Sequence, residues 1–208
     1  MVNAWLTAGS AAVGLVVGAA ASWITRTLLR RPAHIAQSWW LGAVITATLL
    51  ALLGWRISFH GELLVYAYVL TLGVPLAVID WVEHRLPRIV VLPQLAGAAL
   101  GLGLLCVTRF DLVSGLRALG AALAAAGFYL LLAVLVEGGV GSGDVSLAAV
   151  VGLVTGWSGW PELAGSLVLA SLGTLLLLLL PHHGSRRKAV PFGPCLLTAM
   201  TTVLVMSG

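Results

Sequence analysis

The sequence predicts an all-α integral membrane protein with about eight transmembrane helices, one of which is preceded by a glycine-rich break. Three observations support this fold class. Of the 208 residues, 60% are hydrophobic and only 9% are charged, whereas soluble domains have roughly 25% charged residues. Apolar runs recur along the whole chain, and basic or glycine-rich segments separate them. A single anchor or a removable signal peptide would account for only one such run.

The apolar segments, taken in order, define the expected helices. About 20 residues are needed to cross the hydrocarbon core, and the sixth segment supplies only 16. We expect its missing length to come from upstream, which places part of Gly138–Gly143 at membrane depth. The eight segments are Ala4–Leu29, Trp39–Trp55, Leu63–Ile79, Ile89–Val107, Val113–Val136, Val145–Trp160, Leu163–Leu180 and Val190–Met206. Two glycine pairs, Gly14 with Gly18 and Gly97 with Gly101, have the spacing that lets helices approach closely.

The positions of the basic residues predict the orientation. If all eight segments cross the membrane, alternate loops contain eight of the eleven Lys and Arg residues. The positive-inside rule then places those loops in the cytoplasm and both termini outside. We therefore expect a multi-pass protein of the cytoplasmic (inner) membrane. The eight residues are Arg26, Arg30, Arg31, Arg85, Arg88, Arg186, Arg187 and Lys188.

Composition also limits the partners. The isoelectric point is about 9.7, but the basic residues lie between apolar segments and not along one face, so we expect no nucleic-acid partner. Cys106 and Cys195 are isolated, and no metal-ligand spacing occurs, so we expect no metal or other cofactor. We expect one membrane-embedded domain over residues 1–208, with an additional helix and cytoplasmic loop at 1–37 and a core at 60–206.

Two aspartates are the candidate chemical groups. Asp80 ends the apolar segment LTLGVPLAVID, and Asp144 begins the sixth segment, so both are expected at one depth near the cytoplasmic face. Carboxylates at membrane depth are costly, and they are functional candidates by default. Two adjacent aspartates cannot both ionise easily, so one of them holds a proton. Such a pair can activate a water as general base and protonate a leaving group as general acid.

The glycines before Asp144 have two interpretations. Gly139, Gly141 and Gly143 lack the side chain that would hinder a sharp turn or the approach of an extended substrate. Alternatively, GGVGSGD is an ordinary loop in which Asp144 is the helix N-cap. These residues taken alone leave both interpretations open.

At these residues the chain resembles the type IV prepilin peptidases, which are GxGD aspartic peptidases of the membrane. The sequence Gly141-Ser142-Gly143-Asp144 matches the GxGD motif, and Asp80 followed by WVEHR and Leu86-Pro87 is similar to the family's other motif. Two further stretches, VPFGPCLL from Val190 and GLVVGAAASWITRTLLRRP from Gly14, are similar to the family's last and first helices. The resemblance therefore touches most of the chain in the same order.

The resemblance implies that Asp80 and Asp144 form a catalytic pair, with Gly141 and Gly143 as motif backbone. It implies that the substrate is a prepilin-like precursor with a short basic leader before a hydrophobic helix. Cleavage is then expected at the cytoplasmic face, commonly after a glycine.

Two glutamates and one proline near the aspartate pair are candidate substrate contacts. They are Glu83, Glu137 and Pro87, and the two glutamates would attract a basic leader. The alternative for both glutamates is a solvated charge at the membrane interface.

Three departures from the family pattern limit what the resemblance implies. The segment Pro32–Ser38 is too short for the cysteine-containing cytosolic insert of longer members, so no methyl transfer is expected. Ser146 stands where a lysine is common, and Arg88 stands where Asp or Asn is usual.

Two other functions fit the same residues. A transporter or channel could bind a cation at Asp80 and Asp144 beside a broken helix. A noncatalytic relative could bind pilin precursors without cutting them, and Ser146 in place of the lysine is one argument for that alternative.

Overall fold

The computed structural model describes residues 4–29, 38–57, 60–135, 141–179 and 192–207. These residues form eight α-helices, in agreement with the predicted number and order. The helices are α1 (Ala4–Leu28), α2 (Trp39–Arg56), α3 (Gly61–Glu83), α4 (Arg88–Arg109), α5 (Leu112–Leu135), α6 (Ser142–Ser158), α7 (Trp160–Leu179) and α8 (Phe192–Ser207).

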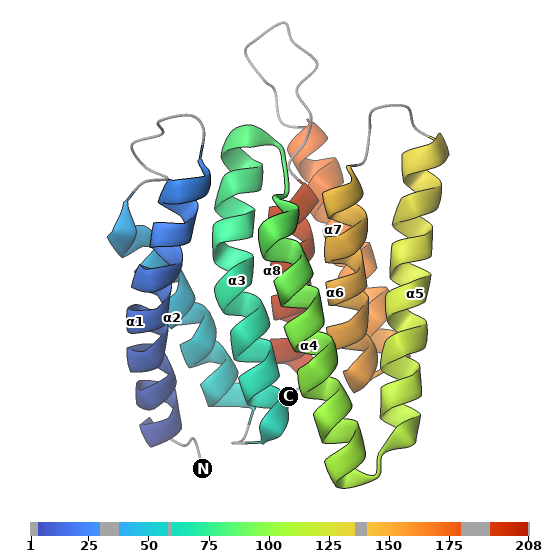
Figure 1. The fold of residues 1–208 in the computed structure, drawn as a ribbon, viewed down its shortest axis with the longest axis horizontal. Helices are drawn as coiled ribbons and strands as arrows, with labels where there is room; N and C mark the ends of the chain where they lie inside the picture. Colours follow the sequence, from blue (N-terminus) through green and yellow to red (C-terminus); the bar gives the residue numbers. More distant parts are fainter. Residues whose placement is uncertain (1–3, 30–37, 58–59, 136–140, 180–191, 208) are drawn as a thin grey trace, which may run out of the picture.

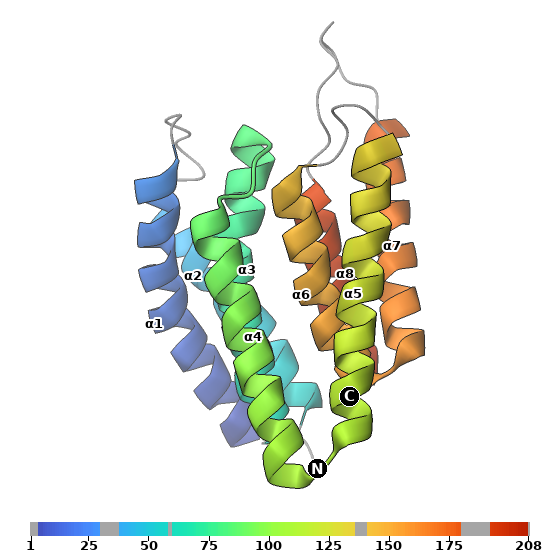
Figure 2. The ribbon, with the colours of Figure 1, turned by 45° about the vertical axis from the view of Figure 1, so that its right-hand side comes forward.

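The helices run up and down along one axis, and both chain termini lie at the same end of the bundle (Figure 1). Two hairpins, α1 with α2 and α5 with α6, have the most extensive helix-to-helix contacts. Helices α3, α6 and α8 form the interior, because much of each one is buried. Helices α4 and α8 each contact both α3 and α6, so they join the two halves that Figure 2 shows side by side.

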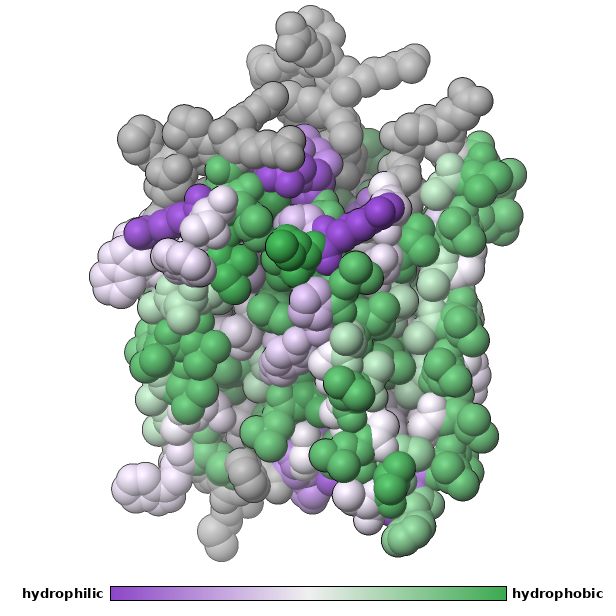
Figure 3. All heavy atoms as spheres, in the orientation of Figure 1, coloured by the Kyte–Doolittle hydropathy of each residue, from purple (hydrophilic) through white to green (hydrophobic). Residues whose placement is uncertain are grey.

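The surface of the bundle is that of a membrane protein. Six of the described helices are long and apolar enough to cross a bilayer. Large hydrophobic side chains are exposed along them, including Leu100, Leu123 and Leu176. Figure 3 shows hydrophobic side chains over the middle of one face and strongly hydrophilic ones near its ends. The chain is therefore a multi-pass, all-α membrane protein.

The sixth helix is short, as the sequence indicates. Helix α6 has 17 residues and begins at Ser142, three positions before the predicted start. Most of its side chains are buried against neighbouring helices, so the helix is surrounded by protein and not by lipid. Part of the expected upstream extension, Gly138–Val140, lies outside the described residues.

The glycine pairs have the predicted packing role. A Cβ on Gly14 would lie 2.6 Å from the Cα of Ala47, and one on Gly18 would lie 2.9 Å from the Cα of Ala43. Both pairs of atoms would clash, so these glycines let α1 and α2 touch backbone to backbone. Gly97 and Gly101 instead leave room on α4 for side chains of α3, because an added Cβ would strike those of Tyr68 and Val65, respectively.

One predicted boundary is wrong in a way that affects the candidate site. The apolar run ends at Ile79, but α3 continues to Glu83, where His84 adopts a left-handed conformation (φ 51°) and its N–H bonds to the carbonyl of Asp80. Asp80 therefore lies in the last full turn of the helix and not at its end. Hydropathy marks where a helix leaves the apolar layer, whereas backbone hydrogen bonding continues until the chain turns.

Candidate active site

Asp80 is held by the start of a distant helix. It is only 4% exposed, and its Oδ2 accepts a hydrogen bond of 2.8 Å from the backbone N–H of Gly193. Gly193 lies in the first turn of α8, where backbone N–H groups have no partner within the helix and favour a negative charge. A Cβ on residue 193 would lie 2.9 Å from Oδ2 of Asp80. A side chain at this position would therefore displace the Asp80 carboxyl group or the start of α8.

Asp144 lies in the first turn of α6. Its Oδ2 accepts a hydrogen bond of 2.9 Å from the backbone N–H of Gly141, which is the N-cap residue. The interpretation of Asp144 itself as the N-cap is therefore wrong, because Asp144 is three residues further along. It has the position of the acidic residue in a capping box, which reaches back to the N-cap N–H. The side chain is partly exposed.

The first turn of α6 packs against the segment that joins α3 to α4. A Cβ on Gly143 would lie 2.6 Å from the Cβ of Leu86 and 2.9 Å from its carbonyl oxygen. This contact places the GxGD motif directly beside Leu86-Pro87. The two motifs that the sequence separates by more than fifty positions are thus in van der Waals contact.

The two aspartates are brought to the same end of the bundle. The end of α3 and the starts of α4, α6 and α8 all lie at the upper end in Figure 1. The carboxyl groups of Asp80 and Asp144 are close enough for their charges to interact. Asp80 lies on α3 and Asp144 lies on α6, and both of these helices pack against α4 and α8.

The candidate substrate contacts differ in their surroundings. Glu83 forms an ion pair with Arg85, and its side chain is 5% exposed. The guanidinium of Arg85 also donates to the carbonyl of Leu28 at 2.7 Å, so this pair attaches α3 to the end of α1. Pro87 is buried and is the N-cap of α4. Glu137 lies outside the described residues. A substrate-binding role for these three residues stays a prediction.

Several side chains near the pair were not singled out from the sequence. Tyr129, on α5, is 1% exposed and lies close enough to Asp144 for the two groups to interact electrostatically. The ring of Phe192 packs edge-on against Tyr129, with 6.1 Å between the ring centroids. A lone tyrosine in the apolar α5 segment is the signal that could have identified this position.

Arg88 has a defined partner at the edge of the site. Its Nη2 donates a hydrogen bond of 2.6 Å to Oγ of Ser142, the variable residue of the GxGD motif. Both residues are exposed. The arginine that departs from the family pattern therefore joins the start of α4 to the start of α6.

The arrangement has the features that acid–base chemistry on a peptide requires. Two carboxyl groups lie at one end of the bundle, one on a buried helix turn and one at a partly exposed helix start. Each has an oxygen fixed by a backbone N–H of a glycine, which limits the orientation of the carboxyl plane. Such a pair can share one proton and position a water between its oxygens.

Comparison with known proteins agrees with the motifs. No curated protein and no solved structure matches the chain. The model of the type IV leader peptidase family matches residues 64–180. This match covers more than half of the chain and includes both Asp80 and Asp144. The protein, a multi-pass membrane peptidase, therefore belongs to the type IV leader peptidase family.

Proposed function

We propose that the protein is an aspartic endopeptidase that removes the short basic leader from prepilin-like precursors at the cytoplasmic face of the inner membrane. The observation that carries this proposal is the presence of Asp80 and Asp144 at one end of the bundle, with Asp80 hydrogen-bonded to Gly193 and Asp144 to Gly141. The family match supports a peptidase that acts on leader sequences.

The proposed reaction needs only the two carboxyl groups and a water. The ionised aspartate takes a proton from the water, whose oxygen attacks the scissile carbonyl carbon, while the protonated aspartate donates to the carbonyl oxygen. The tetrahedral intermediate then collapses, the C–N bond breaks, and the leaving nitrogen receives a proton from the pair. The products are the leader, with a new carboxyl terminus, and the mature protein, with a new amino terminus. No covalent enzyme intermediate forms.

The distribution of basic residues in the sequence supports an orientation in which the end that holds the two aspartates faces the cytoplasm. Arg26, Arg85 and Arg88 lie at the end that holds the two aspartates. Excess Lys and Arg in short loops faces the cytoplasm. The leader of a precursor inserted in the same membrane, with its basic segment in the cytoplasm, would then meet the two aspartates at their own depth.

The test is coexpression of the protein with candidate prepilin-like precursors from the same genome, followed by N-terminal sequencing of the product. Asp80→Asn and Asp144→Asn should each abolish cleavage. Asparagine keeps a side-chain oxygen that can accept the Gly193 or Gly141 N–H, so both variants should remain inserted and folded. Asp111→Asn is the matched control because Asp111 lies at the opposite end, between α4 and α5, and cleavage should be retained.

The outcomes separate the candidate functions. Complete processing by Asp144→Asn would rule out the two-aspartate mechanism. Stable binding of the precursor by the unmodified protein without any cleavage would instead select the noncatalytic binding function. Ion-dependent transport without cleavage would select the transporter.

A further inference from the structure

The first turn of α8 orients Asp80, and its three residues have different surroundings. The backbone N–H of Gly193 donates to Oδ2 of Asp80 at 2.8 Å. Phe192 packs on an aromatic ring of α5, and Pro194 borders an apolar cavity. Phe192 and Pro194 are two residues apart, which places them on nearly opposite sides of a helix with 3.6 residues per turn. The position of the Gly193 N–H therefore depends on what supports this turn from each side.

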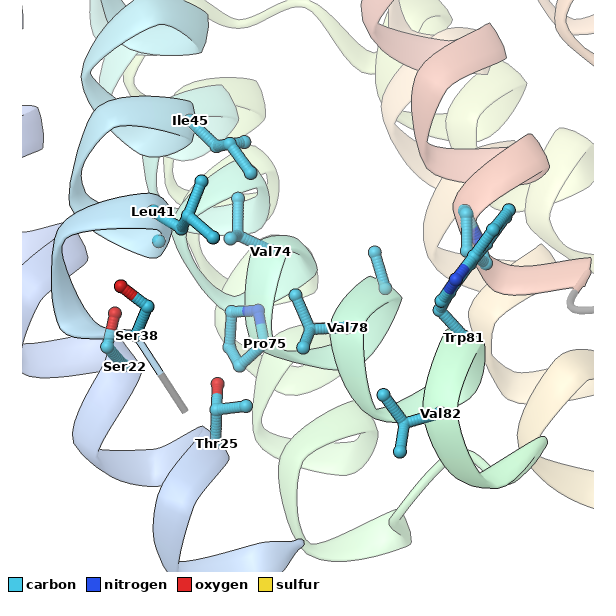
Figure 4. A pocket seen from close by; sticks show the side chains of 13 residues that line it. Ser22, Thr25, Ser38, Leu41, Ile45, Val74, Pro75, Val78, Trp81 and Val82 are labelled. Carbon is cyan, nitrogen blue, oxygen red and sulfur yellow. The ribbon is translucent and has the colours of Figure 1, made fainter. Parts of the chain in front are cut away.

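The Pro194 side of the turn is loosely packed. A cavity of about 470 Å³ lies between the α1–α2 hairpin and α3, and Figure 4 shows side chains that line it. A second cavity, of about 160 Å³, also has Pro194 in its lining. Neither lining includes Gly193 or an aspartate. Atoms that face a void have no packing partners on that side, so this side does little to hold the Gly193 N–H in place.

The Phe192 side of the turn is held by Tyr129. The side chain of Tyr129 is 1% exposed. Its ring meets the ring of Phe192 at an interplanar angle of 89°, with 6.1 Å between the centroids. Aromatic pairs favour this arrangement, because the positive edge of one ring faces the negative face of the other. None of the described residues hydrogen-bonds to the Tyr129 hydroxyl, so the ring is the part of the side chain that supports α8.

Tyr129 is itself fixed relative to the helix that carries Asp144. Helices α5 and α6 form one of the two most extensively packed hairpins of the bundle. A Cβ on Gly152 of α6 would lie 2.5 Å from the carbonyl oxygen of Ala121 and 2.9 Å from the Cα of Ala122 on α5. The two helices are therefore in backbone contact. A ring of α5 that holds the start of α8 thus relates the donor of one aspartate to the helix of the other.

We propose that Tyr129 is a positioning residue for Asp80. Its ring holds Phe192, and through Phe192 the N–H of Gly193, against the carboxyl group. This inference rests on the proposed function, because it assigns Tyr129 a role in peptide cleavage. A carboxyl group that loses its fixed donor samples orientations in which it cannot exchange a proton with the attacking water. Loss of the ring should therefore lower kcat and leave KM unchanged, since no contact with the substrate is removed.

The first experiment separates the ring of Tyr129 from its hydroxyl. Tyr129→Leu removes both, whereas Tyr129→Phe keeps the ring that faces Phe192. The measurement is kcat and KM for a precursor, with purified protein in detergent and kcat expressed per folded molecule. Tyr129→Leu should lower kcat by about tenfold to a hundredfold, the scale on which misplaced reacting groups slow a reaction. Tyr129→Phe should keep most of the activity, and an equal loss in both variants would overturn the assignment to the ring.

Tyr66→Leu is the matched control. Tyr66 is also a buried tyrosine, at 4% exposure, but it lies near the start of α3, and its hydroxyl pairs with Ser158 at the end of α6. This variant should lose thermal stability while its kcat per folded molecule stays at the unmodified value. A fall in kcat as large as that of Tyr129→Leu would show a general loosening of the bundle and would overturn the proposal.

The route through Gly193 is tested by combining two changes. In Gly193→Ala the added Cβ, 2.9 Å from Oδ2 of Asp80, disturbs the same carboxyl group. If Tyr129 acts through Gly193, the double variant should lose little more activity than the more impaired single variant. Losses that multiply would show independent effects and contradict the route. Phe192→Leu should reproduce the loss in Tyr129→Leu. If Tyr129→Leu does not fold, a Phe192→Leu variant with unmodified kcat overturns the proposal.

A second experiment does not depend on turnover. Hydrogen–deuterium exchange reports how often a bonded N–H opens. Tyr129→Leu should raise exchange in the first turn of α8, and Tyr66→Leu should leave it unchanged. Unchanged exchange in Tyr129→Leu would overturn the proposal whether or not a precursor is cut. If the unmodified protein cuts no precursor, the proposed function fails. If it cuts one, and Tyr129→Leu has the unmodified kcat, the role of Tyr129 is wrong while the peptidase stands.

Discussion

The backbone N–H of Gly193 donates a hydrogen bond of 2.8 Å to Oδ2 of Asp80, although the two residues are 113 positions apart. The bond ties the first turn of α8 to the last turn of α3. It also orients one carboxyl group of the candidate pair with a donor that belongs to the backbone and cannot rotate away. The orientation of the Asp80 carboxyl group therefore depends on how α8 packs against α3.

Gly193→Ala should therefore impair cleavage without unfolding the protein. The added Cβ would lie 2.9 Å from Oδ2 of Asp80, so the carboxyl group or the helix start must move. A displacement of this kind can cost about a hundredfold in rate. The measurement is the initial rate of precursor cleavage by purified protein in detergent.

Gly103→Ala is the control for this prediction because nothing lies within 4 Å of a Cβ at that position. Its cleavage rate should equal that of the unmodified protein. A Gly193→Ala variant with the same rate as Gly103→Ala would show that the Asp80–Gly193 bond does not matter for activity.

The two glycines of the GxGD motif should differ in their tolerance of alanine. A Cβ on Gly143 meets the backbone oxygen of Leu86 at 2.9 Å, whereas one on Gly141 meets only Oδ2 of Asp144, at 3.2 Å. Overpacking against backbone costs about 1–3 kcal/mol. Gly143→Ala should therefore lower both the thermal stability and the cleavage rate more than Gly141→Ala. The reverse order in thermal unfolding and in cleavage would contradict the packing of α6 on Leu86.

Two substitutions of Gln94 test whether the interior of the bundle excludes water. It is fully buried on α4, its Nε2 donates to the carbonyl of Val69 at 2.7 Å, and its Oε1 has no partner among the described residues. Gln94→Met keeps the volume and removes the unpaired oxygen, so the free energy of unfolding should stay nearly the same. Gln94→Glu should destabilise the protein by about 3 kcal/mol, the cost of an acidic group within a membrane helix. Chemical denaturation in detergent measures the free energy of unfolding of both variants. Equal values for Gln94→Met and Gln94→Glu would show that Gln94 is not in a dry environment.

Arg117 should stabilise the far end of α6. Its Nε donates to the carbonyl of Gly156 at 2.8 Å, and its Nη2 donates to the carbonyl of Trp157. These carbonyls belong to the last turn of α6, which has no further helical donors. Arg117→Gln should lower the free energy of unfolding by about 2 kcal/mol, because hydrogen bonds from charged groups are lost.

The matched variant is Arg109→Gln at the same end of the bundle. Arg109 forms a partly exposed ion pair with Glu62, and its loss should cost no more than about 1 kcal/mol. If denaturation shows that Arg109→Gln is the more destabilising of the two, the capping role of Arg117 is incorrect.

Local patterns account for much of the fold. Hydropathy predicted eight helices in the right order because a membrane-spanning helix satisfies its own backbone hydrogen bonds, and only its side chains need to suit the lipid. Helix ends were less accurate, as the extension of α3 to Glu83 shows. Those ends depend on turns such as the left-handed His84, which hydropathy does not record.

The candidate site was predicted only in part. Asp80, Asp144 and the glycines beside Asp144 stand out in a chain with few charges. The hydrogen bond from Gly193, the position of Tyr129 and the pairing of Arg88 with Ser142 do not follow from spacing. Each of them joins helices that are far apart in the chain.

The amino-acid sequence by itself therefore determined the membrane class, the succession of helices and the two acidic residues worth testing. Tertiary structure alone decided that α8 supplies a donor to Asp80, that Gly143 rests on Leu86, and that Arg88 pairs with Ser142. The physical reason is that hydropathy and helix formation depend on residues within one or two helical turns of each other in the sequence. Contacts between distant helices depend on how whole helices pack in the folded chain.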